Sequence, residues 1–457
     1  MRERLDPAVL RLAAIMVLGC MGPLLASTVV TVAIPTLARE LDAPVSTVQW
    51  VGTGYLLALA MTVPVTGWAV DRFGAWRMWL VALLVFLAGS LLSGSAGDIG
   101  SLVAFRVVQG AGAGLMLPIM QTVIMRAAGG RRLGRLMAVI TLPAVLGPAL
   151  GPVVGGLVVA DLGWRWTFFL NLPISVAAIL LAVRHVPRDE PAHDRRLDLV
   201  GLLLLSPALA ALIYGLVRIG SHGGDAVAPL VVGAVLFAAF VWRALRTADP
   251  VIDLRLFRVR SFTAANTVVF LGGLAFYGVL FLLPLYYQQL RGTSVIATGL
   301  FLAPQGVGSL LARGLGGVID RVGPRPVVVA SLAVTAAGTA PFALAGQHTS
   351  EWLLASALVV LGVGLSSVNM AVVVGAFRDL STEQIPHASS TNRITQQLGG
   401  AFGTAVLAMI LQSGLAGHRI ATAFDTTFGW VLVFTALAVI PALLMGTGRG
   451  TATGPAR

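Results

Sequence analysis

Two stretches of the chain, residues 67–74 and residues 316–323, both read Gly-x-x-x-Asp-Arg-x-Gly. In each copy the acid follows a long apolar stretch, so Asp71 and Asp320 are predicted to lie where a helix ends. A carboxylate there can lie against the N-terminus of another helix, where free N–H groups and the helix dipole favour negative charge. The flanking glycines permit close approach. The pattern predicts a conformational latch, and its alternative is a solvated turn. The predicted latch residues are Gly67, Asp71, Arg72, Gly74, Arg77, Asp320 and Arg321.

Arg106 stands about two turns inside a different apolar stretch, with Gln109 one turn further along. A charge at membrane depth is costly, so such a residue is by default a functional candidate. We expect Arg106 to face a central cavity. The alternative is a structural Arg that bonds backbone carbonyls or extends to the membrane surface. Arg313 lies near the end of another apolar stretch, so we expect its side chain to extend to the membrane surface.

The 19 acidic residues and six His all fall in predicted loops or at predicted helix ends. This distribution bears on one class of membrane protein, the proton-driven transporters. Proton antiport needs a group whose pKa responds to its environment, and Arg is almost always protonated. If the protein is a transporter, three options remain for how its transport is driven. A helix-end acid reached by water carries the proton, with Asp98 and Asp71 as candidates. The cargo carries the charge, with Arg106 binding its anionic group. Or transport runs downhill without protons.

Catalytic motifs are not found. The chain has no HExxH, no GxSxG and no predicted buried acid pair, which counts against a membrane-embedded enzyme. A nucleotide-binding GxxxxGK[ST] loop is also missing, which disfavours ATP-driven transport. The single cysteine, Cys20, allows neither an intrachain disulfide nor a Cys-based metal site. We therefore predict no catalytic residue, no metal and no cofactor. A polytopic sensor is a further class, but no signalling domain is recognised.

The composition predicts a multi-pass membrane protein. Of the 457 residues, 57% are hydrophobic and only 11% are charged, too few to cover the surface of a soluble protein. A spanning helix needs about 20 apolar residues. Fourteen stretches meet this need: 11–35, 47–70, 77–97, 100–126, 134–160, 166–184, 198–219, 227–246, 262–288, 295–319, 326–346, 351–377, 386–413 and 428–447.

The arginines predict the orientation. All 31 basic residues are Arg, and with a cytoplasmic N-terminus most of them fall in inner segments, Arg393 among them. Only Arg106 and Arg313 are assigned to spans. The outer segments receive Arg39, Arg165, Arg218, Arg291 and Arg419. This asymmetry obeys the positive-inside rule with both termini cytoplasmic. It also explains the net charge of +12 without a nucleic-acid partner. The lack of Lys beside so much Ala, Gly and Arg favours a bacterial source and hence the inner membrane.

The repeated motif predicts two related halves. Its copies follow the second and the tenth predicted helix, a separation of eight helices rather than six. Two six-helix bundles with two inserted helices account for this spacing, and such repeats are typical of transporters. We expect an N-terminal bundle over 1–190, helices 7 and 8 with their linkers over 191–250, and a C-terminal bundle over 251–457.

Four motifs, in order and on the expected helices, resemble those of the major facilitator superfamily, in its fourteen-helix drug:proton antiporter family. They are GWAVDRFGAWR at 67–77, RVVQGAG at 106–112, GPALGPVVGG at 147–156 and WRWTFFLNLP at 164–173. The resemblance implies that the helix facing Asp71 begins near residue 386 and that Asp320 plays the symmetric part. It links Arg106 to proton coupling and implies a monomer. It also marks an exporter through the helix 5 residues Gly147, Pro148, Gly151, Pro152, Gly155 and Gly156.

Helix 1 departs from the family pattern. Ala26 stands where an acid is expected, and Thr31 stands where an Asn is expected. The role of that acid is therefore not carried over to this chain.

These patterns favour a transporter that exports amphiphilic small molecules, such as drugs, by alternating access, with the proton gradient as its driving force. The alternative is a dedicated exporter of one metabolite or lipid, with anionic cargo as one form of it. The expected partners are the cargo, the lipid bilayer and protons. Besides Gln109, the predicted cargo contacts are Thr28, Thr31, Tyr55, Tyr277, Gln305, Asn369 and Gln397.

Overall fold

The computed structural model describes residues 7–128, 136, 155, 158–159, 161–189, 197–219, 226–346, 349–381, 383–417 and 419–446. Within these ranges the regular structure is entirely helical. The long helices are built from Leu, Val, Ala and Gly with few charges. A helix satisfies its backbone N–H and C=O groups by hydrogen bonds within the same segment, as a bilayer requires.

The helices up to residue 185 form a first half. They are α1 (Pro7–Glu40), α2 (Val45–Thr62), the 3₁₀ segment η1 (Val63–Val65), α3 (Thr66–Phe73), α4 (Ala75–Gly94), α5 (Ile99–Ala128), α8 (Trp166–Phe169) and α9 (Asn171–His185). Two helices follow, α10 (Leu199–Ile219) and α11 (Val227–Arg246), which pack against each other.

The remaining helices form a second half. They are η2 (Leu254–Arg258), α12 (Arg260–Leu285), the π-helical η3 (Tyr286–Leu290), α13 (Val295–Leu311), η4 (Ala312–Leu315), α14 (Gly316–Val322), α15 (Pro324–Thr339), η5 (Ala340–Ala343), α16 (Glu351–Phe377), α17 (Ile385–Gly417), α18 (Ile420–Leu437) and α19 (Val439–Leu444).

Twelve helices among the described residues are long and apolar enough to cross a membrane. Each coincides with one of the fourteen stretches predicted from hydropathy. Of the other two stretches, 134–160 lies mostly outside the described residues. The stretch 295–319 is divided, because α13 ends at Leu311 and the chain continues through η4 into α14. The structure is thus a many-pass helical membrane fold with twelve candidate spans in its described part.

The repeated motif has the same backbone path in both halves. In each copy a 3₁₀ segment, η1 or η4, interrupts a long helix before the short motif helix, α3 or α14. Each motif helix ends at a glycine with positive φ, Gly74 at 84° and Gly323 at 93°. Only glycine adopts this conformation without strain, so the motif's last glycine makes the sharp turn into the next helix.

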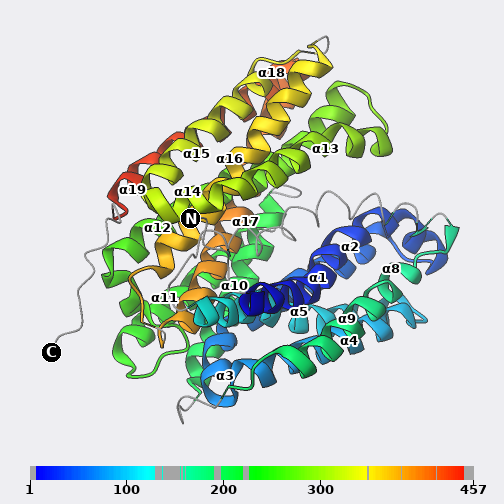
Figure 1. The fold of residues 1–457 in the computed structure, drawn as a ribbon. Helices are drawn as coiled ribbons and strands as arrows, with labels where there is room; N and C mark the ends of the chain where they lie inside the picture. The colour runs from blue at the N-terminus through cyan, green and yellow to red at the C-terminus, as the bar shows by residue number, and fades with distance from the viewer. Residues whose placement is uncertain are drawn as a thin grey trace.

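Figure 1 shows the two halves as separate groups of helices that meet beside α10 and α17. Here α17 packs against α3 and α5 of the first half, and α10 packs against both α2 and α17. One buried apolar cluster runs through both halves and includes Met125 of α5 and Ile385 of α17. Two further clusters belong to one half each. The halves therefore share a core over only part of their length.

Two predicted positions are wrong. Arg393, assigned to the cytoplasmic segments, lies in the third turn of α17, inside a candidate span. Asp425, assigned to a loop, lies within α18, which begins at Ile420 rather than near residue 428. The second error arises because the first turns of α18 are rich in polar residues, so hydropathy does not reveal where that helix begins. Arg393 falls inside the predicted stretch 386–413, so only its assignment to the cytoplasmic segments is wrong.

Candidate functional site between the two halves

Asp71 lies in a buried charged cluster that joins the two halves. It is 3% exposed and comes from α3. Its Oδ2 lies 3.2 Å from Nε2 of His387, a buried residue in the first turn of α17. Its Oδ1 lies 3.5 Å from the guanidinium of Arg126, at the end of α5. We call Asp71, Arg126 and His387 the latch cluster. The resemblance placed a helix start near residue 386 opposite Asp71, and α17 begins there at Ile385.

The glycines of the first motif make room for this cluster. A Cβ atom on Gly67 would lie 3.0 Å from Nδ1 of His387, so the missing side chain is what lets the imidazole approach α3. At Gly74 a Cβ would lie 3.0 Å from a carboxylate oxygen of Asp189. Both glycines therefore serve contacts with neighbouring side chains, and Gly74 also makes the turn.

Asp189 extends the cluster within the first half. Its carboxylate accepts hydrogen bonds from the backbone N–H groups of Ala75, at 2.7 Å, and Trp76, at 2.9 Å. These are the first residues of α4, so Asp189 satisfies free donors at that helix N-terminus. It also lies 3.8 Å from Arg126. Arg126 thus bridges two carboxylates, one of which reaches the second half through His387.

The other charged residues predicted for the latch lie nearer the surface than Asp71 does. Arg72 is half-buried and Arg77 is exposed. In the second copy Asp320 and Arg321 are both exposed, and α14 packs against neighbouring segments of its own half. Sequence reasoning did not identify Arg126, Asp189 or His387. The one available signal was the position of His387, in the first turn of a helix already expected to face Asp71.

Arg106 is completely buried and its donors are bonded. Its Nε donates to the carbonyl of Val51 in α2 at 3.0 Å, and Nη2 donates to the carbonyl of Ala26 in α1 at 3.2 Å. Its Nη1 donates to Gln109, whose amide donates to Ser90. The guanidinium carbon lies 4.0 Å from the ring centroid of Tyr55, a cation–π geometry. Arg106 does not face an open cavity as expected; it bonds backbone carbonyls, as the structural alternative describes.

The glycines that follow Arg106 bring the α5 backbone close to two neighbours. A Cβ on Gly110 would lie 2.3 Å from the carbonyl oxygen of Tyr55 in α2. A Cβ on Gly112 would lie 2.5 Å from the backbone nitrogen of Phe86 in α4. The RxxQGxG pattern is therefore explained by close packing of α5 between α2 and α4.

Asp98, a predicted proton-coupling candidate, caps α5. Its Oδ1 accepts a 3.0 Å hydrogen bond from the backbone N–H of Ser101, and its Oδ2 accepts one from the Ser101 hydroxyl at 2.8 Å. These hydrogen bonds lower the pKa of Asp98, which is exposed. Asp98 is an N-cap residue on the surface, not part of a cavity.

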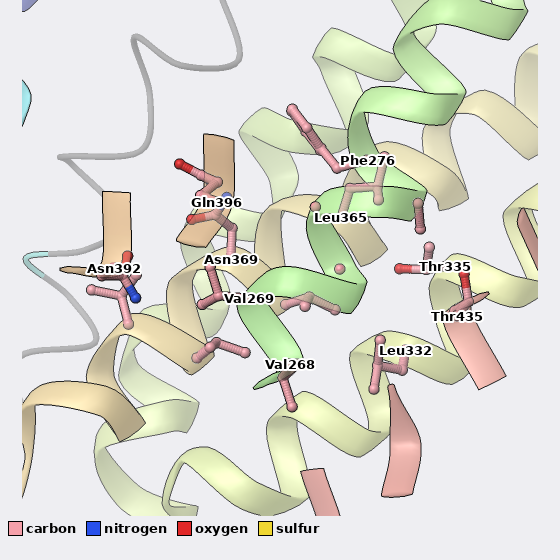
Figure 2. A pocket seen from close by; sticks show the side chains of 16 residues that line it. Val268, Val269, Phe276, Leu332, Thr335, Leu365, Asn369, Asn392, Gln396 and Thr435 are labelled. Carbon is pink, nitrogen blue, oxygen red and sulfur yellow. The ribbon is translucent and has the colours of Figure 1, made fainter. Parts of the chain in front are cut away.

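The second half contains a cavity of about 40 Å³ that is partly open to its surroundings. Its walls come from α12, α15, α16, α17 and α18. Apolar side chains such as Val268, Phe276 and Leu365 form much of the lining. Figure 2 shows Asn369, Asn392 and Gln396 on one side of the cavity and Thr335 and Thr435 on the other. All the lining residues are uncharged, an arrangement typical of sites for amphiphilic small molecules.

Among the predicted cargo contacts, Asn369 lines this cavity. Gln397 is half-buried nearby on α17, and Tyr277 packs beside Gly400. Gln305 lies on α13 facing α16, and Tyr55 is buried under Arg106. The side chains of Thr28 and Thr31 lie outside the described part of the structure. Of the helix 5 exporter residues, Gly155 is helical and buried; Gly147, Pro148, Gly151, Pro152 and Gly156 lie outside the described residues.

Arg393 lies between the halves near this cavity. Its Nη1 donates to Oε1 of Gln396, a cavity-lining residue, at 2.7 Å. Its helix, α17, packs against α3 and α5 of the first half. An Arg at this depth is a functional candidate, which its assignment to the cytoplasmic segments overlooked.

Comparison with known proteins identifies the family. The model of the Major Facilitator Superfamily matches residues 16–404. A multidrug resistance protein B homolog of Mycobacterium tuberculosis is 37% identical over 99% of this chain and 83% of its own length. The tetracenomycin C resistance and export protein of Streptomyces glaucescens is 32% identical over 90% of this chain and 77% of its own.

Solved structures share the fold. A double-Trp mutant of the transporter XylE superposes with a TM-score of 0.69 at 16% identity, covering 96% of this chain and 97% of that one. The human organic anion transporter MFSD10 superposes with a TM-score of 0.68 at 18% identity, covering 96% of this chain and all of the other. The chain therefore belongs to the major facilitator superfamily, in its multidrug efflux family, and is a multi-pass membrane transporter rather than an enzyme.

Proposed function

We propose that this protein exports amphiphilic small molecules, including antibiotics, by alternating access. The observation that carries the proposal is the uneven contact between the halves. They share a buried apolar core and the latch cluster at one end, and each has a separate core elsewhere. Contact at one end only is the arrangement of a transporter closed on one side of the membrane.

The latch end is proposed to be the cytoplasmic side of a bacterial inner membrane. Arg72, Arg77 and Arg126 gather at this end, which agrees with the positive-inside rule. Both termini are then cytoplasmic. The proposed organisation is fourteen helices: N-terminal and C-terminal six-helix bundles over 1–190 and 251–457, with two inserted helices over 191–250. The latch residues Asp71 and His387 hold the cytoplasmic side closed, and a monomer is the functional unit.

The proton gradient is the proposed driving force. Asp71 suits proton coupling better than Asp98, because Asp71 is buried beside an imidazole and a guanidinium, whereas Asp98 is an exposed helix cap. The neutral, mostly apolar cavity favours a broad range of amphiphilic cargo over a dedicated exporter of one metabolite.

Transport in proteoliposomes tests the proposal. The purified chain is reconstituted, and the movement of a fluorescent drug such as rhodamine 6G is followed with and without an imposed proton gradient. We expect transport that accelerates when the gradient is imposed. Equal rates in the two conditions would reject proton coupling. No protein-dependent movement of any amphiphile from a panel of dyes and antibiotics would reject the export function itself.

A further inference from the structure

Arg393 differs from Arg106, Arg243 and Arg291 in how its donors are used. Arg243 lies 2.7 Å from the carboxylate of Asp198, and Arg291 lies 2.6 Å from that of Glu351. The donors of Arg106 are taken up by two backbone carbonyls and an amide. Within the described ranges, Arg393 has no carboxylate within 4 Å, and its one side-chain acceptor is Gln396.

The donors around Arg393 include buried ones without an acceptor. Nε of Arg393 is buried and has no hydrogen-bond partner in the described part of the chain. The same holds for Nδ2 of its neighbour Asn392, whose side chain is 4% exposed and lines the cavity. A buried donor left without an acceptor costs about 1–3 kcal/mol, and more when it is charged. Two such donors on consecutive residues therefore indicate a site built to receive an acceptor.

The position of these donors places the site on the transport route. Arg393 and Gln396 lie on α17, the helix of the second half that packs against the first half. Figure 2 shows Asn392 and Gln396 on one side of the cavity, together with Asn369, while Val268, Leu332 and Phe276 supply apolar wall. A ligand held there meets amide donors at one end and hydrocarbon at the other, and Arg393 lies directly behind the amide end, bonded to Gln396.

We propose that Arg393, with Asn392 and Gln396, binds an anionic group of the cargo, and that the protein's preferred substrates are amphiphilic organic anions. A carboxylate or sulfonate accepts two parallel hydrogen bonds from a guanidinium. Nε of Arg393, which has no partner in the described part of the chain, can donate one of them. The apolar wall binds the rest of the molecule. This inference rests on the proposed export function, for which it names the substrate class.

The test compares two dyes with one ring system and opposite charge. Fluorescein is anionic and rhodamine 6G is cationic at neutral pH, and both are xanthenes. Binding of each dye to the full chain in lipid nanodiscs is measured by fluorescence polarisation. We expect the wild type to bind fluorescein more tightly than rhodamine 6G. Arg393→Gln should weaken fluorescein binding by about tenfold or more and leave rhodamine 6G binding unchanged or tighter.

Arg313→Gln is the matched control, because it removes the same charge from an exposed position in η4 of the same half. Arg393→Lys keeps the charge without the planar fork and should retain part of the fluorescein affinity. The inference is overturned if the wild type does not prefer fluorescein, or if Arg393→Gln and Arg313→Gln weaken it equally. It is also overturned if Arg393→Gln weakens both dyes alike. Transport of rhodamine 6G in proteoliposomes tests the export function separately. A failure of the anion-binding inference can therefore be distinguished from a failure of the proposed export function.

Discussion

The two Gly-x-x-x-Asp-Arg-x-Gly turns share a backbone but not an environment. Both follow a 3₁₀ break, and both end at a glycine with positive φ. Asp71 is nevertheless buried against His387 of the opposite half, whereas Asp320 is exposed. The difference comes from the neighbours: α3 packs against α17, and the described contacts of α14 remain within its own half. A repeated motif thus fixes the turn, while the packing around each copy decides what the acid does.

The largest expected effect is a difference between the two acids. Asp71→Asn should stop transport while leaving the protein folded, because it removes the charge that pairs with Arg126 and His387. Breaking a buried ion pair costs about 3–5 kcal/mol, which would shift the equilibrium between closed and open states by about a hundredfold or more. Asp320→Asn should retain most transport. Proteoliposome transport rates compare the two, and equal losses would show that both turns act as latches.

Removing the partner of Asp71 should have the next largest effect. His387→Ala takes away the hydrogen bond that crosses between the halves, although Arg126 still pairs with Asp71. A hydrogen bond to a charged group contributes about 1.5–3 kcal/mol, so transport should fall about tenfold. His387→Gln keeps a donor near Asp71 and should recover part of this loss. Wild-type rates in His387→Ala would show that the contact plays no part in closure.

Substituting the two turn glycines compares the two copies of the motif by their effect on the thermal stability of the protein. Gly74→Ala and Gly323→Ala both force a side chain into a conformation that costs about 1–3 kcal/mol. Gly74→Ala should lose more, because its Cβ would also press on the Asp189 carboxylate that caps α4. Thermal unfolding in detergent, followed by tryptophan fluorescence, measures both midpoints. A lower midpoint for Gly323→Ala than for Gly74→Ala would contradict this account.

The smallest effect is expected at Asp98. Its lowered pKa keeps the carboxylate ionised at neutral pH, so Asp98→Asn should leave the dependence of transport on a proton gradient unchanged. The capping contribution to stability is present above the ordinary pKa of an aspartate and is lost as pH falls through the lowered one. Transport measured across pH 5.5–8 checks the first point. A variant that no longer responds to the gradient would assign the coupling role to Asp98.

Hydropathy predicts much of this fold because a bilayer imposes one length and one composition on each crossing. It fails where polar residues begin a helix. The first turns of α18, which begins at Ile420, carry Asp425 and several Thr, so they resemble a loop and the predicted stretch begins only at residue 428. The site was predicted only in part for a related reason: the motif identified Asp71, but its partners come from α5 and α17, and no local pattern in the sequence joins those helices.

The hydrogen bonds of Arg106 set a limit on how the first half can move. Its guanidinium, carried by α5, holds the backbones of α1 and α2 through the carbonyls of Ala26 and Val51. Sliding any one of these three helices past the others would leave a charged donor without an acceptor in a medium that cannot supply one. In the proposed alternating-access cycle we therefore expect the three helices to tilt together, with inward and outward access exchanged at their outer surface rather than among them.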